Sequence, residues 1–142
     1  MDGPRDRLRL FRHRRNARRS RRRDRGFHGL PEQRGLLSAL RGIGLRIGII
    51  TTLGPLTNAQ GRAILQQAGL SQFLDPDGFI SDHDAGVAKP ATGIYRFAAQ
   101  QVGVPIERCL YVGENLIEVI GALTAGMKAV LKPSPPGREL PV

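Results

Sequence analysis

The sequence predicts an α/β sandwich with a mostly parallel sheet, and three observations lead to that fold class. From Pro31 onward, helical patterns and short apolar runs alternate, beginning with a helix and ending with a strand. The run 109–112 is apolar throughout, which is typical of a strand buried in a parallel sheet. Glycine or proline punctuates the segments, as expected for turns between alternating elements of a sheet with right-handed crossovers. The length of 142 residues suits one domain with a moderate core.

A helix over 31–41 opens the ordered part of the chain. Pro31 suits a first helical turn, and Gly42 suits the end of the helix. Its expected core face holds three leucines at helical spacing: Leu36, Leu37 and Leu40.

A strand over 45–50 and a second helix follow. After a Gly-Pro turn, Thr57 or Asn58 can cap this helix, which runs to Ala68 before Gly69. The residues of its expected inner stripe are Ile64, Leu65 and Ala68.

The third strand is expected over 79–81, after an Asp-Pro-Asp-Gly turn. A loop over 82–89 then leads to a helix that begins near Pro90. Its residues spaced for burial are Ile94, Phe97, Ala98 and Val102.

The last unit is a strand over 109–112, a helix that closes on Gly126, and a strand over 129–131. The helical pattern is carried by Leu116, Ile117, Ile120, Leu123 and Thr124.

The positive charge is concentrated at the start of the chain. Residues 1–25 hold 12 Arg and 3 Asp and so carry nine of the ten net charges, which leaves the remainder nearly neutral. Such a segment cannot bury enough surface to offset its ordering entropy. We therefore expect a disordered leader over 1–28, a partial α/β core over 29–132 and a Pro-rich tail over 133–142. Three interpretations of the leader stay open: a solvated tail, an arm (residues 1–25) that binds nucleic acid or another polyanion, or a segment translated from a displaced start.

The composition excludes two classes of protein: membrane-spanning proteins and small disulfide-stabilised secreted proteins. No apolar run resembles a signal peptide or a membrane span, so no membrane partner is expected. Cys109 is the single cysteine and lies in a predicted buried strand, which excludes a disulfide framework and fits a reducing cytoplasm.

Polar side chains gather where the predicted strands end. Thr51 and Thr52 follow the strand 45–50, Lys89 stands before a helix, and Glu114 and Glu118 follow the strand 109–112. In doubly wound sheets the carboxyl ends of the strands share one edge, where ligands bind. A hydroxyl, an ammonium and two carboxylates at that edge suit a phosphate bound together with Mg²⁺.

The order of these residues resembles the haloacid dehalogenase superfamily of hydrolases, most closely its phosphoglycolate-phosphatase-like branch. The resemblance rests on Thr51, on Gly-x-x-Lys-Pro at 86–90 and on Val-Gly-Glu-x-x-x-Glu at 112–118, and it covers roughly residues 31–131. It implies a Rossmann-like three-layer sandwich. It also implies Mg²⁺-dependent hydrolysis of a small phosphate monoester through an aspartyl-phosphate.

The same resemblance implies a role for each residue. Thr51, with Thr52 beside it, would bind the phosphoryl group, and Lys89 would neutralise the phosphate and the nucleophile. Glu114 would bind Mg²⁺ and Glu118 would support it. The family usually has Asp where this chain has Glu114, and the additional methylene displaces the carboxylate against the strict octahedral geometry of Mg²⁺.

The family pattern is incomplete before residue 31. No Asp-x-Asp-x-Thr follows an apolar run there, so we expect a core that lacks the first strand, the nucleophile and the cap domain. Strands left without a ladder partner would favour instability or self-association. Alone, the chain is expected to be inactive or weak. The alternative function is a non-catalytic remnant or a module that binds polyanions through the basic leader.

Overall fold

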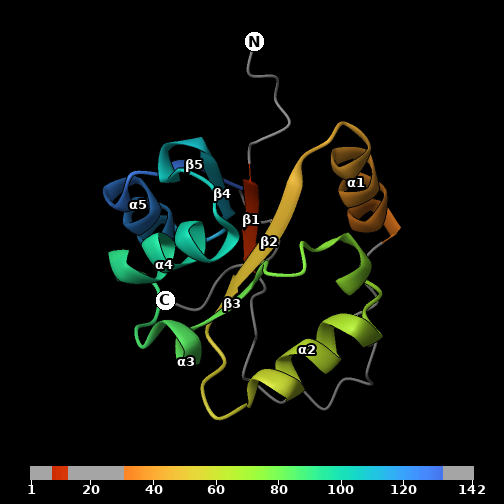
Figure 1. Ribbon diagram of the computed structural model, residues 1–142, viewed down its shortest axis with the longest axis horizontal. Coiled ribbons are helices and arrows are strands. Elements are labelled where there is room, and N and C mark those ends of the chain that lie inside the picture. Colours follow the sequence, from red (N-terminus) through yellow and green to blue (C-terminus); the bar gives the residue numbers. More distant parts are fainter. Residues whose placement is uncertain (1–7, 13–30, 133–142) are drawn as a thin grey trace, which may run out of the picture.

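A five-stranded parallel sheet organises the computed structural model, which describes residues 8–12 and 31–132 (Figure 1). The strand order is β3-β2-β1-β4-β5, and every neighbouring pair is parallel. The strands are β1 (Leu8–Arg12), β2 (Arg46–Thr51), β3 (Phe79–Ser81), β4 (Cys109–Gly113) and β5 (Lys128–Leu131). The predicted Rossmann-like α/β fold class is confirmed.

Helices cover both faces of the sheet, which makes three layers (Figure 1). One face is covered by α1 (Pro31–Gly42) and α2 (Asn58–Gln67), and the other by α4 (Thr92–Val102) and α5 (Leu116–Ala125). The remaining short elements are the helix α3 (Asp82–Ala85) and the 3-10 turns η2 (Ser71–Phe73) and η3 (Ile106–Arg108). The expected loop 82–89 therefore begins with a helical turn, because the Ser81 side chain accepts a hydrogen bond from the Asp84 N–H and caps it.

The expectation that the first strand is missing is wrong. β1 lies between β2 and β4, with Leu8 opposite both Arg46 and Cys109 in the register. Sequence reasoning weighed the arginine content of the whole leader, but this window holds three large apolar residues in five. Without β1, the facing edges of β2 and β4 would each leave a row of backbone N–H and C=O groups unpaired. The short strand β1 pairs with both rows. The rest of the expected leader, and the tail from residue 133, lie outside the described residues.

Filling this position also changes the basis for the expected self-association. The unpaired edges of β2 and β4 are occupied by β1. Among the described strands, β3 and β5 form the outer edges of the sheet. Self-association through strand edges stays a prediction, now directed at those two strands.

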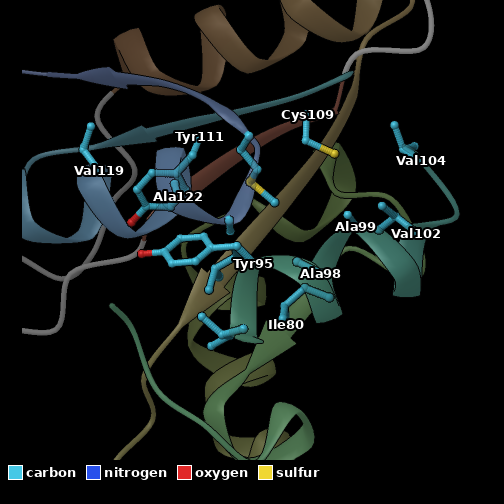
Figure 2. Packing of buried hydrophobic residues seen from close by; sticks show 14 residues of the cluster. Ile80, Tyr95, Ala98, Ala99, Val102, Val104, Cys109, Tyr111, Val119 and Ala122 are labelled. Carbon is cyan, nitrogen blue, oxygen red and sulfur yellow. The ribbon is translucent and has the colours of Figure 1, made fainter. Parts of the chain in front are cut away.

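The larger hydrophobic cluster lies between the sheet and the α4–α5 layer (Figure 2). Tyr95 from α4 and Tyr111 from β4 are both fully buried there, and their rings meet edge to face with centroids 5.3 Å apart. Cys109 is buried in the same cluster, as expected for a small core residue. On the opposite face, Ile47 packs with leucines of α1, and Ile49 packs beneath α2.

Two predicted helix faces differ from the structure. In α1, Leu37 and Leu40 are buried but Leu36 is exposed. The difference is larger in α5, where the predicted apolar stripe faces away from the core: Leu116, Ile117, Ile120 and Leu123 are all at least half exposed. The inner face instead holds Glu118, Val119, Gly121, Ala122 and Ala125.

A close approach of two backbones explains the orientation of α5. A Cβ at Gly121 would collide with the carbonyl oxygen of Pro90. Only a face made of small residues lets the helix lie this near the Pro90 loop. The large aliphatic side chains of α5 are consequently directed outward.

The remaining helix boundaries agree closely with the predicted ones. Thr57 caps α2 in a capping box with Gln60, and Gly126 ends α5 in the left-handed conformation. None of the helices in the described part of the chain is long and apolar enough to span a membrane.

Candidate active site

The carboxyl edge of the sheet presents the first of the predicted site residues. Thr51 is the last residue of β2, is 5% exposed, and lies opposite Ser81 at the end of β3. Thr52 follows it and is exposed. The strand register therefore places Thr51 at the edge of the sheet, while Thr52 belongs to the loop beyond it.

Lys89 reaches the same place from the loop between α3 and α4. Its side chain is only 2% exposed, and its Nζ donates a hydrogen bond of 3.1 Å to the carbonyl oxygen of Ile50. That carbonyl belongs to the peptide group that links Ile50 to Thr51. The ammonium is thus fixed beside Thr51, although 38 residues separate the two in sequence.

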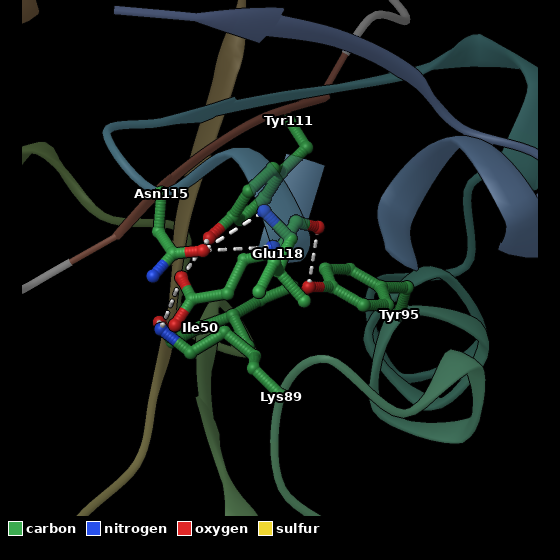
Figure 3. A network of polar contacts seen from close by, with 7 residues as sticks. Ile50, Lys89, Tyr95, Tyr111, Asn115 and Glu118 are labelled. Atoms are coloured by element: carbon green, nitrogen blue, oxygen red, sulfur yellow. Dashed lines mark hydrogen bonds and ion pairs between the residues drawn. The ribbon is translucent and has the colours of Figure 1, made fainter. Parts of the chain in front are cut away.

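Glu118 completes this group from the first turn of α5. Its Oε2 lies 3.7 Å from the Nζ of Lys89, and the Tyr111 hydroxyl donates a hydrogen bond of 3.2 Å to the same oxygen (Figure 3). The Tyr95 hydroxyl donates one of 2.7 Å to the backbone carbonyl of Glu118. The acid is therefore held both by its carboxylate and by its main chain, and its side chain is only 12% exposed, which weakens the screening of its charge by water.

Asn115 sets where α5 begins and so where Glu118 lies. Its Oδ1 accepts hydrogen bonds from the N–H groups of Ile117 and Glu118, at 2.9 and 3.2 Å. This is the side-chain cap that an Asn before a helix typically provides. The capped end of α5 brings the positive end of the helix dipole to the sheet edge, where it favours bound anions.

Glu114 comes directly after Gly113, the last residue of β4, and is half-buried. It therefore leaves the sheet at the same edge as Thr51. The structure brings Thr51, Lys89 and Glu118 together, and it places Glu114 at the end of the neighbouring strand without an ion pair or side-chain hydrogen bond to those three among the described residues.

The described residues do not form a complete site for Mg²⁺. Within residues 34–132, whose side chains the structure describes, no three His, Cys, Asp or Glu side chains come close enough to share a metal ion. The carboxylate of Glu118 already contacts the Lys89 ammonium and the Tyr111 hydroxyl. A cation at this edge would have to compete with that ammonium for Glu118. No chemical step through a metal follows from these residues.

The loop after Thr51 is tied to α3 rather than left open. Asp82 accepts a hydrogen bond of 2.8 Å from the Leu53 N–H, and Asn58 donates one of 2.9 Å to Asp84. The exposed His83 contacts the carbonyl oxygen of Gly54 through its Nε2 at 2.9 Å. These contacts hold the loop that follows Thr52 against α3 at the carboxyl edge of the sheet.

Sequence reasoning missed the residues that hold the site in place. Tyr111 lies in the predicted strand 109–112 and Tyr95 in the helix predicted from near Pro90, and no spacing rule links either to Glu118. Asn115 could have been found, because an Asn after a strand-ending glycine and before a helical pattern is a cap signal. The tyrosines could not, because their contacts depend on how α4, α5 and β4 pack.

Comparison with known proteins decides the family. The sequence matches the haloacid dehalogenase-like hydrolase family over residues 15–126, which is most of the chain. The chain belongs to this family. The matched span contains all the residues that the structure places at the sheet edge from β2 onward.

Its relatives include several phosphatases. The chain is 35% identical over 103 residues to a phosphatase of Mycobacterium tuberculosis, covering 72% of this chain and 46% of that protein. It is 34% identical over 100 residues to a pyrimidine 5'-nucleotidase of Escherichia coli, covering 69% and 42%. It is 36% identical over 107 residues to a glyceraldehyde 3-phosphate phosphatase of Pyrococcus abyssi, covering 71% and 41%. The chain thus spans less than half the length of these relatives.

Solved structures show the same fold. A phosphatase of the family from Thermococcus onnurineus superposes with a TM-score of 0.65 at 29% identity, covering 77% of this chain and 48% of that one. A dehalogenase trapped as an intermediate complex superposes with a TM-score of 0.64 at 26% identity, covering 77% and 47%. The core is therefore shared by phosphatases and dehalogenases.

Proposed function

We propose that this chain supplies the phosphoryl-binding part of a hydrolase that acts on a small phosphate monoester. The observation that carries the proposal is the buried Lys89 ammonium, which donates a hydrogen bond to the carbonyl of Ile50, the residue before the buried Thr51. A cation held in a largely water-excluded site is suited to balancing the charge of a phosphoryl group. The phosphatases among its relatives favour that use over dehalogenation.

Each residue has a distinct task in this proposal. The Thr51 hydroxyl donates a hydrogen bond to a phosphoryl oxygen, and Lys89 neutralises the phosphoryl charge. Glu118 keeps Lys89 in place, Thr52 adds a donor at the rim, and the positive end of the α5 dipole favours the bound anion. The family resemblance implies Mg²⁺ held by Glu114 with help from Glu118, but Glu118 already contacts the Lys89 ammonium and the Tyr111 hydroxyl, so the proposal assigns no step to a metal.

The proposed reaction also needs a nucleophile at the end of β1, and the sequence there is not acidic. β1 ends with Phe11 and Arg12, and His13 follows. An aspartyl-phosphate cannot form on these side chains. We therefore propose that the chain by itself binds phosphate but turns over phosphate monoesters weakly or not at all.

Phosphate binding and turnover can be measured separately. We expect inorganic phosphate to bind in isothermal titration calorimetry and Lys89→Ala to abolish that binding. Lys128→Ala is the matched control, because Lys128 is an exposed lysine on β5. Loss of binding in both variants, or in neither, would reject the assignment of Lys89.

The turnover assay uses para-nitrophenyl phosphate, with and without Mg²⁺. Uridine monophosphate and glyceraldehyde 3-phosphate complete the panel, because relatives of the chain are named for a nucleotidase and a triose phosphate phosphatase. Robust turnover that requires Lys89 would show that another residue replaces the missing Asp. A rate at the uncatalysed level, together with phosphate binding, supports the proposal.

A second candidate function, binding of a polyanion, is favoured by the nine net positive charges in residues 1–25. Deleting that segment is not a clean test, because it removes β1 from the centre of the sheet. Replacing the arginines at 18, 19, 21, 22 and 23 by glutamine leaves β1 intact. Binding to single-stranded nucleic acid that falls steeply with salt, and is lost in this variant, would support the second function.

A further inference from the structure

The two buried tyrosines next to Glu118 have no place in the predicted site, yet both donate hydrogen bonds to this residue. Tyr111 donates to the carboxylate at 3.2 Å, and Tyr95 donates to the backbone carbonyl at 2.7 Å. Their rings also support each other, with an interplanar angle of 83°. Figure 3 shows the two hydroxyls reaching Glu118 from different sides.

A buried tyrosine needs a partner for its hydroxyl, but these two partners differ in chemistry. The contact of Tyr95 is with the main chain and fixes the backbone of α5 against α4. The contact of Tyr111 is with the oxygen that also faces the Lys89 ammonium. A hydrogen bond from a hydroxyl to a carboxylate is charge-assisted and directional, and at 3.2 Å this one is longer than the usual range of about 2.5–2.7 Å, so it guides the carboxylate without holding it tightly.

The orientation of the Glu118 carboxylate determines how well it pairs with the Lys89 ammonium. The Oε2 of Glu118 lies 3.7 Å from the Nζ of Lys89, which is an ion pair but too long for a good direct hydrogen bond. Attraction at this distance does not by itself select one rotamer of a side chain with three rotatable bonds. The hydrogen bond from Tyr111 supplies a directional contact that favours one rotamer.

We propose that Tyr111 is a positioning residue that orients the Glu118 carboxylate and thereby holds the Lys89 ammonium at the sheet edge. The inference rests on the proposed function, in which Lys89 contacts the phosphoryl group. Tyr95 performs the structural part of the same task and has no direct effect on the carboxylate. The pair therefore offers a matched comparison: each Tyr→Phe change removes one hydroxyl that bonds Glu118, but only Tyr111→Phe removes a hydrogen bond to its carboxylate.

The test measures how fast the Lys89 amine is acetylated. The chain has three lysines, and both Lys128 and Lys132 are exposed. Brief acetylation with a succinimidyl ester, followed by mass spectrometry, gives the rate at Lys89 relative to these internal standards. We expect Tyr111→Phe to raise the relative rate about tenfold, the effect of losing one hydrogen bond to a charged group. We expect Tyr95→Phe to change it by less than about twofold.

A double-mutant cycle separates positioning from general loosening. In a Glu118→Gln background the carboxylate is gone, so Tyr111→Phe should no longer accelerate acetylation of Lys89. Equal acceleration by Tyr111→Phe and Tyr95→Phe, or an unchanged Tyr111 effect in the Glu118→Gln background, would overturn the inference. If Tyr111→Phe does not fold, Glu118→Asp is the substitute variant, because its shorter side chain withdraws the carboxylate from Tyr111. A relative acetylation rate of Lys89 in Glu118→Asp equal to that in the unmodified chain would also overturn the inference.

Phosphate titrations of the same variants separate the two proposals. With the acetylation pattern as expected and no phosphate bound by the unmodified chain, Tyr111 positions Lys89 but the proposed function fails. With phosphate bound through Lys89 and equal affinities in Tyr111→Phe and Tyr95→Phe, the function stands and the positioning role fails. Weaker phosphate binding in Tyr111→Phe than in Tyr95→Phe supports both.

Discussion

The ion pair between Lys89 and Glu118 makes a quantitative prediction about stability. The side chains are 2% and 12% exposed, and the charged atoms lie 3.7 Å apart. At the effective dielectric constant of about 20 that suits such sites, the direct attraction is about 4 kcal/mol. Replacing Lys89 by Met leaves the carboxylate buried without this cation. We expect that change to lower the free energy of unfolding by about 3 kcal/mol, the usual cost of breaking a buried pair.

Removing the charge of Glu118 instead of that of Lys89 should lower the free energy of unfolding by less. A glutamine at 118 keeps an oxygen that can accept the Tyr111 hydrogen bond, and Lys89 keeps its bond to the Ile50 carbonyl. We expect Glu118→Gln to cost about 2 kcal/mol. In the double variant neither charge is buried alone, so its cost should be smaller than the sum of the two by about 2 kcal/mol.

Urea unfolding followed by far-ultraviolet circular dichroism measures all four proteins, and it suits a chain without tryptophan. The slopes of the unfolding transitions should agree, so that the midpoints report stability alone. Additive costs, within about 0.5 kcal/mol, would show that the two charges do not interact in solution. The geometry of the site as described would then be wrong.

Three further predictions concern the sheet, the core and α5. Leu10→Pro, in the centre of β1, should lower the free energy of unfolding by at least about 3 kcal/mol, because it removes a backbone donor from a central strand. The control Leu10→Val should cost little. Equal urea midpoints for the two variants would place residues 8–12 outside the sheet. Burial raises the pKa of the Cys109 thiol from its usual 9.0 to about 11, so the unfolded thiol ionises first. Stability is then complete below about pH 9 and falls by about 1.4 kcal/mol for each pH unit up to about 11, and Cys109→Ala should lack this component of the pH profile. Ile117→Gln and Ile120→Gln should each change stability by less than about 0.5 kcal/mol, while Val119→Ala should cost about 2 kcal/mol; large costs at 117 or 120 in thermal unfolding would mean that the exposed side of α5 is covered.

Local sequence patterns located most elements because turn and cap residues act within a few positions. Thr57 caps α2 through Gln60, and Gly126 ends α5, both from contacts inside one turn of chain. The three residues Thr51, Lys89 and Glu118 could be predicted to meet because parallel strands bring their carboxyl ends to one edge. Topology alone was sufficient for that part of the site.

Contacts between distant segments could not be read in the same way. The large aliphatic residues of α5 form a good helical stripe, but the fit of Gly121 against Pro90 decides which side faces the sheet. The Tyr111 hydrogen bond to Glu118 likewise depends on the packing of β4 against α5. Hydrophobic periodicity describes one helix in isolation and contains no term for such steric limits.

The central strand shows why the fold and the chemistry of this family can be separated. A strand between β2 and β4 must supply backbone donors and acceptors in register, and many short sequences with apolar residues meet that requirement. Leu8–Arg12 does so without an acid at its carboxyl end. Nucleophilic catalysis, in contrast, depends on one side chain at one position of that same strand. In the proposed function the sheet keeps Thr51, Lys89 and Glu118 assembled around a phosphate while β1 offers no acid to attack it, and for this reason binding and turnover have to be measured as separate properties.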